Sequence, residues 1–188
     1  TKYYQKGDYY TKGGPDTHSF WLGKSAEKFE LSGAVDFKIF QALLEGRLPN
    51  GELMSQVKKG EYHRPGYDLT FSAPKSVSLL ALVAGNETVL KAHREAVSET
   101  IAKIEQKYGA CRIKNNGIVN IEKTGNFTVA AFEHGDSRAG DPNLHTHCVL
   151  MNVTQDMNGK WRALYADELY PNNLLNGMEY RSSLAHKL

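Results

Sequence analysis

The spacing of apolar residues changes near Gly109, and this change constrains the fold more than any other feature of the sequence. Between Asn86 and Tyr108 the apolar side chains recur at intervals of three and four, which predicts one long amphipathic helix that ends at Gly109. Beyond it the interval falls to two residues, the period of a half-buried strand. Strands are therefore expected at residues 117–122, 126–134 and 144–153, with a last helix at 173–187.

The first half of the chain mixes short elements of both kinds after an irregular start at residues 1–24. Helices are expected at residues 25–31 and 36–46, the second capped by Asp36, and another helix opens at Pro74. Residues 67–71 alternate apolar and polar side chains, which predicts a strand. Because hairpin-like links join the later strands, we expect an α+β domain whose mainly antiparallel sheet is covered by helices.

Composition sets few limits on function. The 188 residues suit one domain, and a formal net charge of +2 neither indicates nor excludes a nucleic-acid partner. No apolar run approaches the roughly 18 residues of a membrane span, and no signal peptide is evident, so membrane insertion is not expected. Cys111 and Cys148 are too few for a disulfide framework and fit a reducing compartment.

Three histidines lie where two neighbouring strands can bring them together. His145 and His147 are two residues apart in one predicted strand, so their side chains point to the same face. His134 ends the preceding strand, and the loop between them can return the chain antiparallel. Three imidazoles at that spacing can bind one divalent ion and leave coordination positions open, as in a catalytic metal site. Asp68, on a separate strand, is a candidate hydrogen-bond acceptor for a ligand imidazole.

The histidines alone leave other interpretations open. A His-x-His sequence on a strand is often a pair of partly exposed side chains, and a hydrolytic metal-hydroxide centre would use the same ligands. The paired tyrosines Tyr3-Tyr4 and Tyr9-Tyr10 lie in a polar segment and are either surface aromatics or nucleophiles. A phenol with a pKa of about 10 needs activation, and a metal that polarises a phosphodiester would lower that demand.

Several motifs, taken in order, resemble those of a known family. They are the two tyrosine pairs, Leu43–Pro49, Tyr67–Ser78 and Asp141–His147, and they span nearly all 188 residues. This pattern resembles the relaxase domain of the conjugative relaxases of the MobF class, which are HUH endonucleases. The resemblance implies the HUH relaxase palm and an enzyme that nicks one strand of plasmid DNA at the origin of transfer. The enzyme would stay attached to the 5′ end through a phosphotyrosine and later rejoin the strand.

Motif position implies a role for each site residue. Tyr3, ahead of its neighbour Tyr4, would be the first nucleophile, and Tyr9 or Tyr10 would serve a second strand transfer. The three histidines would hold one divalent ion, with Mg, Mn, Zn and Ni all left open. Asp68 would orient a ligand histidine and could also take the phenol proton. The three ligands are His134, His145 and His147.

The resemblance also implies partners. Single-stranded and hairpin origin-of-transfer DNA would be the substrate, and accessory relaxosome proteins and the coupling protein would assemble with the enzyme in the bacterial cytoplasm. Phosphate contacts need Lys and Arg. Arg64, Lys75 and Arg138 each lie within a few residues of a motif and are therefore candidate DNA contacts. For each of the three, an ordinary solvated surface charge is the alternative interpretation.

Two departures from the family pattern qualify this assignment. Thr1 and Lys2 alone precede the first tyrosine pair, where the family has a strand, and the family's domain continues beyond 188 residues. Residues 1–188 are therefore expected to be a relaxase domain truncated at both ends. The rival interpretations are a rolling-circle replication initiator, which is not expected to share the Tyr67–Ser78 motif, and a DNA-binding module that has lost catalysis. Retention of the histidines and of both tyrosine pairs argues against the second.

Overall fold

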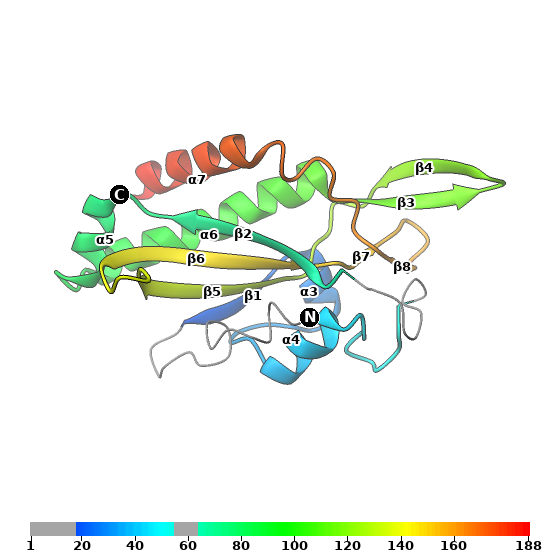
Figure 1. Cartoon of the computed structure of the whole chain (residues 1–188), viewed down its shortest axis with the longest axis horizontal. Helices are drawn as coiled ribbons and strands as arrows, with labels where there is room; N and C mark the ends of the chain where they lie inside the picture. The colour runs from blue at the N-terminus through cyan, green and yellow to red at the C-terminus, as the bar shows by residue number, and fades with distance from the viewer. Residues whose placement is uncertain (1–17, 55–63) are drawn as a thin grey trace.

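The computed structural model describes residues 18–54 and 64–188. The two tyrosine pairs fall outside the described residues. Figure 1 shows the arrangement of the elements. In chain order they are β1 (Ser19–Leu22), α3 (Lys24–Lys28), α4 (Phe37–Leu44), β2 (Gly66–Ser72), α5 (Lys75–Leu82), α6 (Glu87–Tyr108), β3 (Ala110–Asn115), β4 (Ile118–Lys123), β5 (Val129–Asp136), β6 (Pro142–Met151), β7 (Thr154–Gln155), β8 (Trp161–Arg162) and α7 (Asn173–Lys187).

A four-stranded sheet forms the centre of the molecule. Its strand order is β1-β5-β6-β2, and every neighbouring pair is antiparallel, as the hairpin-like links predict. The strands expected at 126–134 and 144–153 are β5, which begins three residues later and ends two later, and β6, which begins and ends two residues earlier. Two smaller antiparallel pairs, β3–β4 and β7–β8, complete the strands of the described residues, and β3–β4 projects from the body as a ribbon (Figure 1).

Helices cover both faces of the sheet because alternate residues of its strands point to opposite sides. On one face, Leu144, Cys148 and Leu150 of β6 join a core with α5, α6 and α7. On the other, Val149 and Met151 join a second core with α3 and α4. Figure 1 shows these helices on opposite sides of the sheet. The odd-numbered residues of β6 therefore share the α3–α4 face, which fixes where its two histidines point.

The predicted cap of α4 and the predicted end of α6 are both confirmed, but the glycine after α6 is needed for a different reason than the one predicted. Asp36 caps α4, since its carboxylate accepts from the backbone N–H groups of Lys38 and Ile39 at 2.8 and 3.0 Å. Gly109 does follow the last residue of α6, but its φ of −59° and ψ of 110° are extended values that any residue can adopt. A Cβ there would lie 2.6 Å from the carbonyl oxygen of Glu105, so close packing rather than a left-handed turn requires glycine.

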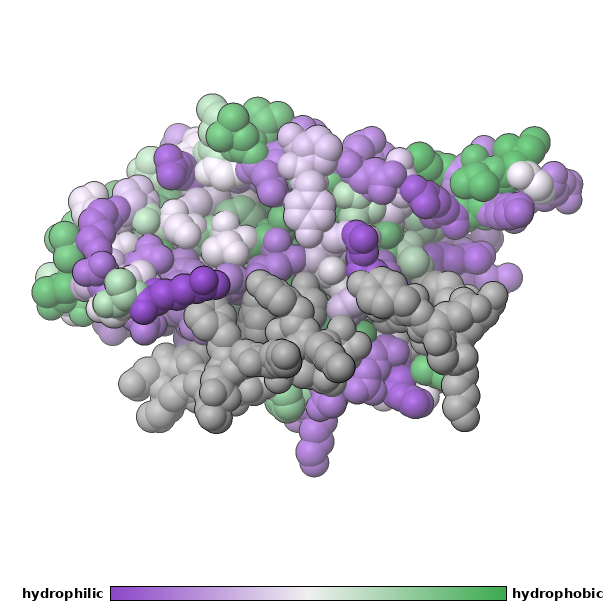
Figure 2. Space-filling view, in the orientation of Figure 1, coloured by the Kyte–Doolittle hydropathy of each residue, from purple (hydrophilic) through white to green (hydrophobic). Residues whose placement is uncertain are grey.

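Four strands were not predicted from the period of two: β1, β3, β7 and β8. The four residues of β1 lie in the stretch expected to be irregular, and they are too few to show an alternation. The ribbon strand β3 was also not predicted. It pairs with β4, whose apolar residues Ile118, Val119 and Ile121 are between 53% and 65% exposed. These apolar side chains form a green patch on the ribbon in Figure 2.

Within residues 18–54 and 64–188, no helix has the length and apolar character needed to cross a bilayer.

Candidate metal centre

Strand register brings the three predicted histidines together on one face of the sheet. His134 of β5 is directly opposite His145 of β6, and the register shifts just beyond, between His134 and Asp136. On the other side of β6, Thr70 of β2 is opposite His147. Because β6 lies between β5 and β2, its two histidines are flanked by His134 on one side and by the polar residues of β2 on the other.

The imidazole rings have the spacing of a ligand set. Their centroids are 5.4 Å apart for His134 and His145, 5.6 Å for His134 and His147, and 5.2 Å for His145 and His147. Three imidazoles bound to one tetrahedral ion at about 2.1 Å per nitrogen would have centroids roughly 5 Å apart. In the described part of the chain, however, no group of three or more His, Cys, Asp or Glu side chains already has its donor atoms converged on one point. The three rings therefore have the residue type and spacing of a ligand set, without the convergent geometry of a formed metal site.

Hydrogen bonds to the Nδ1 atoms orient two of the rings. His147 Nδ1 lies 2.9 Å from Asp68 Oδ2 and 3.1 Å from the Thr70 hydroxyl. His145 Nδ1 lies 2.8 Å from the carbonyl oxygen of Asn143. Since a carbonyl and a carboxylate accept, each Nδ1 donates, so Nε2 is the unprotonated nitrogen of both neutral rings. The contact expected between Asp68 and one of the imidazoles is thus present.

Burial disfavours the protonated form of two of the three histidines, His134 and His145. Desolvation lowers the pKa of His134 to about 4, and the neighbouring imidazoles of His145 and His147 act in the same direction. Desolvation also lowers the pKa of His145, although its hydrogen bond to the carbonyl of Asn143 opposes that shift. Neutral imidazoles hold the lone pairs that a metal needs, so protons do not compete for His134 near neutral pH.

A buried polar network supports β6 from the opposite face. Thr146, between the two histidines, points to the α6–α7 side, where its hydroxyl lies 2.8 Å from Nε2 of His93. The Nδ1 of His93 lies 2.7 Å from the Tyr180 hydroxyl. The sequence pattern predicts His93 as a core histidine, and it is fully buried. Its partners could not be predicted, because Thr146 and Tyr180 are 53 and 87 residues away in the sequence.

A second polar contact lies beside the first histidine. Glu133 of β5 binds Arg94 of α6 through two hydrogen bonds of 2.8 and 2.7 Å, a bidentate pair that joins the long helix to the sheet. Because Glu133 precedes His134, this pair fixes the strand at the position of the first histidine. No motif in the sequence indicated it.

The three candidate DNA contacts lie in different places. Arg138 is exposed in the loop that links β5 to β6, beside the histidine cluster. Lys75 is also at that end of the sheet, and its ammonium donates to the carbonyl of Pro142 at 3.0 Å. Arg64 lies at the far end of β2, where its guanidinium is 5.4 Å from the centroid of the Tyr67 ring.

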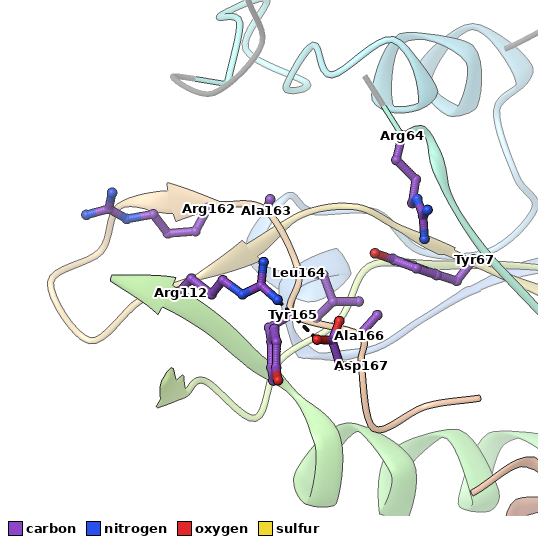
Figure 3. Close-up of a pocket in the computed structure, with 9 residues that line it drawn as sticks. All are labelled: Arg64, Tyr67, Arg112, Arg162, Ala163, Leu164, Tyr165, Ala166 and Asp167. Atoms are coloured by element: carbon purple, nitrogen blue, oxygen red, sulfur yellow. Dashed lines mark hydrogen bonds and ion pairs between the residues drawn. The ribbon is translucent and has the colours of Figure 1, made fainter. Parts of the chain in front are cut away.

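A cavity of about 480 Å³ beside Arg64 was not predicted from the sequence. Figure 3 shows Arg64 and Arg112 pointing into it from opposite sides, whereas Arg162 points away. Arg112 lies 4.6 Å from the centroid of Tyr165 and donates to Asp167 at 3.1 Å. Arginines and aromatic rings in one hollow suit nucleic acid, but residues spread over three elements leave no motif that could have indicated it.

Comparison with known proteins identifies the family. The model of the TrwC relaxase family matches residues 1–188, so the chain belongs to that family. The multifunctional conjugation protein TraI of Escherichia coli strain K12 is 40% identical over 196 residues, which cover 99% of this chain and 11% of TraI.

Solved structures agree with this assignment. The metal-bound conjugative relaxase TrwC in complex with oriT DNA gives a TM-score of 0.91 at 43% identity, covering 99% of this chain and 65% of that one. A copper-bound complex of TrwC with oriT DNA gives 0.85 at 42% identity, covering 99% and 64%. TrwC with a 27-mer of the recognition hairpin and cleavage site gives 0.85 at 45% identity, covering 90% and 61%. The predicted fold of helices around an antiparallel sheet is therefore confirmed, and the chain spans less than two thirds of these solved chains.

Proposed function

We propose that this chain is the DNA-nicking and strand-transfer domain of a conjugative relaxase, acting at an origin of transfer. The observation that carries the proposal is the three-imidazole cluster with its Asp68 contact, in a chain that belongs to the TrwC relaxase family. Relatives solved with both a metal and oriT DNA support the same substrate and a divalent metal.

The reaction is a transesterification. The phenol oxygen of Tyr3 attacks the scissile phosphorus, the bond from phosphorus to the 3′ oxygen breaks, and a 5′-phosphotyrosine forms. The phenol gives up its proton, and the 3′ oxygen leaves as a hydroxyl after gaining one, so charge and protons balance. The phosphodiester energy is conserved in the new ester, so that a later attack by a 3′ hydroxyl can rejoin the strand. Motif position favours Tyr3 for the first step and Tyr9 or Tyr10 for a second.

The residues of the sheet would hold and orient the metal. His134, His145 and His147 would be the ligands, and Asp68 would keep the ring of His147 turned for binding through Nε2. A bound divalent ion would polarise the phosphate and offset the charge that develops during attack. Neutral imidazoles favour Zn and Ni over Mn and, most of all, over Mg, whose preference is for oxygen ligands. Cellular abundance could still favour Mg.

The proposed partners follow from the same assignment. The substrate would be single-stranded and hairpin DNA of the origin of transfer, with Arg64, Lys75 and Arg138 as candidate phosphate contacts. Accessory relaxosome proteins and a coupling protein would complete the assembly in the bacterial cytoplasm.

A direct assay for a covalent adduct tests the proposal. The protein is incubated with a divalent ion and a single-stranded oligonucleotide that spans the origin of transfer of its own plasmid. We expect a protein–DNA adduct that survives denaturation, and its loss when His145 and His147 are both replaced by alanine without loss of the fold. Tight binding with no adduct would indicate a DNA-binding module, and full activity of the double variant would refute the metal assignment.

A further inference from the structure

A small cavity opens where the outer edge of the sheet meets the last helix. It has a volume of about 330 Å³ and lies between the middle of β2 and the first turns of α7. We call it the edge slot and define it by Thr70 of β2 and Asn173, Asn176 and Gly177 of α7. Asp68 also lines it, so the slot adjoins the carboxylate that contacts His147.

The strand side of the slot offers backbone hydrogen-bonding groups. Within the described residues, β2 is the end strand in the order β1-β5-β6-β2. Ala73 N–H donates to Leu144 at 2.9 Å and Asn152 N–H to Pro65 at 3.2 Å, so odd-numbered residues of β2 pair with β6. The backbone N–H and C=O groups of the even-numbered Thr70 consequently point away from β6, at the open edge of the sheet.

On the helix side of the slot lies a buried amide with a donor that makes no hydrogen bond to the rest of the described protein. The side chain of Asn176 is 6% exposed, and its Nδ2 has no hydrogen-bond partner among the described residues. Buried polar groups are nearly always paired in folded proteins, so an orphaned donor beside a cavity points to a ligand. Asn173, one turn earlier, adds a second amide on the same side of the helix.

Gly177 indicates that the slot is kept open. It lies inside α7, where glycine weakens a helix relative to alanine. A Cβ at this position would meet nothing within 4 Å, so no packing contact within the described protein requires glycine. The space beside the helix backbone at Gly177 is therefore open to a bound group.

We propose that the edge slot binds one base of the single-stranded DNA next to the cleavage site, an inference that rests on the proposed function. Asparagine amides combine donors and an acceptor, which suits hydrogen bonding to the edge of an unpaired base. A cavity of 330 Å³ lies within the usual range of ligand pockets, and its contact with Asp68 places the base close to the histidine cluster.

The test combines protein variants that fill the slot with DNA that lacks one base. Gly177→Leu fills the slot, and Gly177→Ala changes the helix with little added volume. Ala185→Leu, at an exposed position of the same helix, is the matched control. Each variant is titrated with origin oligonucleotides that carry one abasic nucleotide, moved along the strand position by position. Asn176→Ala provides a second route should Gly177→Leu fail to fold.

We expect one abasic position to weaken binding of the wild-type protein by about tenfold, and Gly177→Leu to weaken binding of intact DNA similarly. At that one position the two losses should not add, because both remove the same contact. Losses that add at every position, or a Gly177→Leu variant that binds like wild type, would overturn the inference. Failure of the wild-type protein to bind any origin oligonucleotide would overturn the proposed function itself.

Discussion

Buried His93 should make the stability of this domain depend on pH. Its pKa is lowered from 6.5 to about 4, chiefly because burial disfavours the charged ring. At about 1.4 kcal/mol per pKa unit, this difference corresponds to roughly 3 kcal/mol of unfolding free energy. Above pH 6.5 the ring is neutral in both states and carries no penalty. As the pH falls from 6.5 toward 4, the unfolded chain binds the proton more readily, so stability falls.

The measurement is urea unfolding at several pH values between 7 and 4, in the presence of a chelator, for the wild type and for His93→Gln. Glutamine retains a donor and an acceptor but does not titrate. We expect His93→Gln to lose about 1–3 kcal/mol at pH 7 through poorer hydrogen bonds to Thr146 and Tyr180. Its stability should then fall less steeply with acid than that of the wild type. His134 and His145, whose pKa values are also lowered, are present in both proteins, and the charge of His145 contributes to the lowered pKa of His93.

His186→Gln, the same change of residue type at an exposed position, provides the control. Parallel loss of stability in wild type and His93→Gln between pH 6.5 and 4 would refute the reasoning. It would mean that His93 is protonated without cost and that the contacts on either side of its ring do not require the neutral form.

Three further predictions concern the site. Asp68→Asn should weaken metal affinity by about 10- to 100-fold, because an amide does not hold the proton of His147 on Nδ1 as a carboxylate does. Calorimetry measures the affinity, and an unchanged value would exclude a role of Asp68 in orienting His147. Arg138→Ala should weaken DNA binding and lower its salt slope by about one unit, whereas an unchanged slope with unchanged cleavage would make Arg138 a solvated surface charge. Tyr3→Phe should abolish the covalent adduct while DNA affinity is retained, and Tyr4→Phe should be milder; peptide mapping that finds the adduct on a tyrosine of the second pair would contradict this.

The sequence was sufficient for elements whose burial follows a regular period. The predicted long helix and last helix are α6 and α7, and the hairpin that aligns His134 with His145 followed from strand period and loop length. The antiparallel sheet followed from the same links. These features depend on residues close together in the chain, which is why a single sequence could indicate them.

Features that depend on distant residues could not be predicted. The contacts of His93 join α6, β6 and α7, and Gly109 is required by the close approach of the Glu105 carbonyl and of Gly125 rather than by its own φ. Likewise, the edge slot exists only where α7 packs beside β2, so Asn176 and Gly177 look like ordinary helix residues in the sequence. The site roles of the histidines, of Asp68 and of the tyrosines stay predictions.

The alignment of β6 with its two neighbours has a consequence for misfolding. Both ends of the β2–β6 ladder are pinned, by Ala73 with Leu144 and by Pro65 with Asn152. A slip of β6 by one residue would turn every side chain to the opposite face. Leu144 and Cys148 would then enter the polar cluster, and the imidazoles would be forced into the apolar layer. Metal binding would therefore report on correct strand pairing, and a misaligned chain would be both unstable and unable to hold the ion.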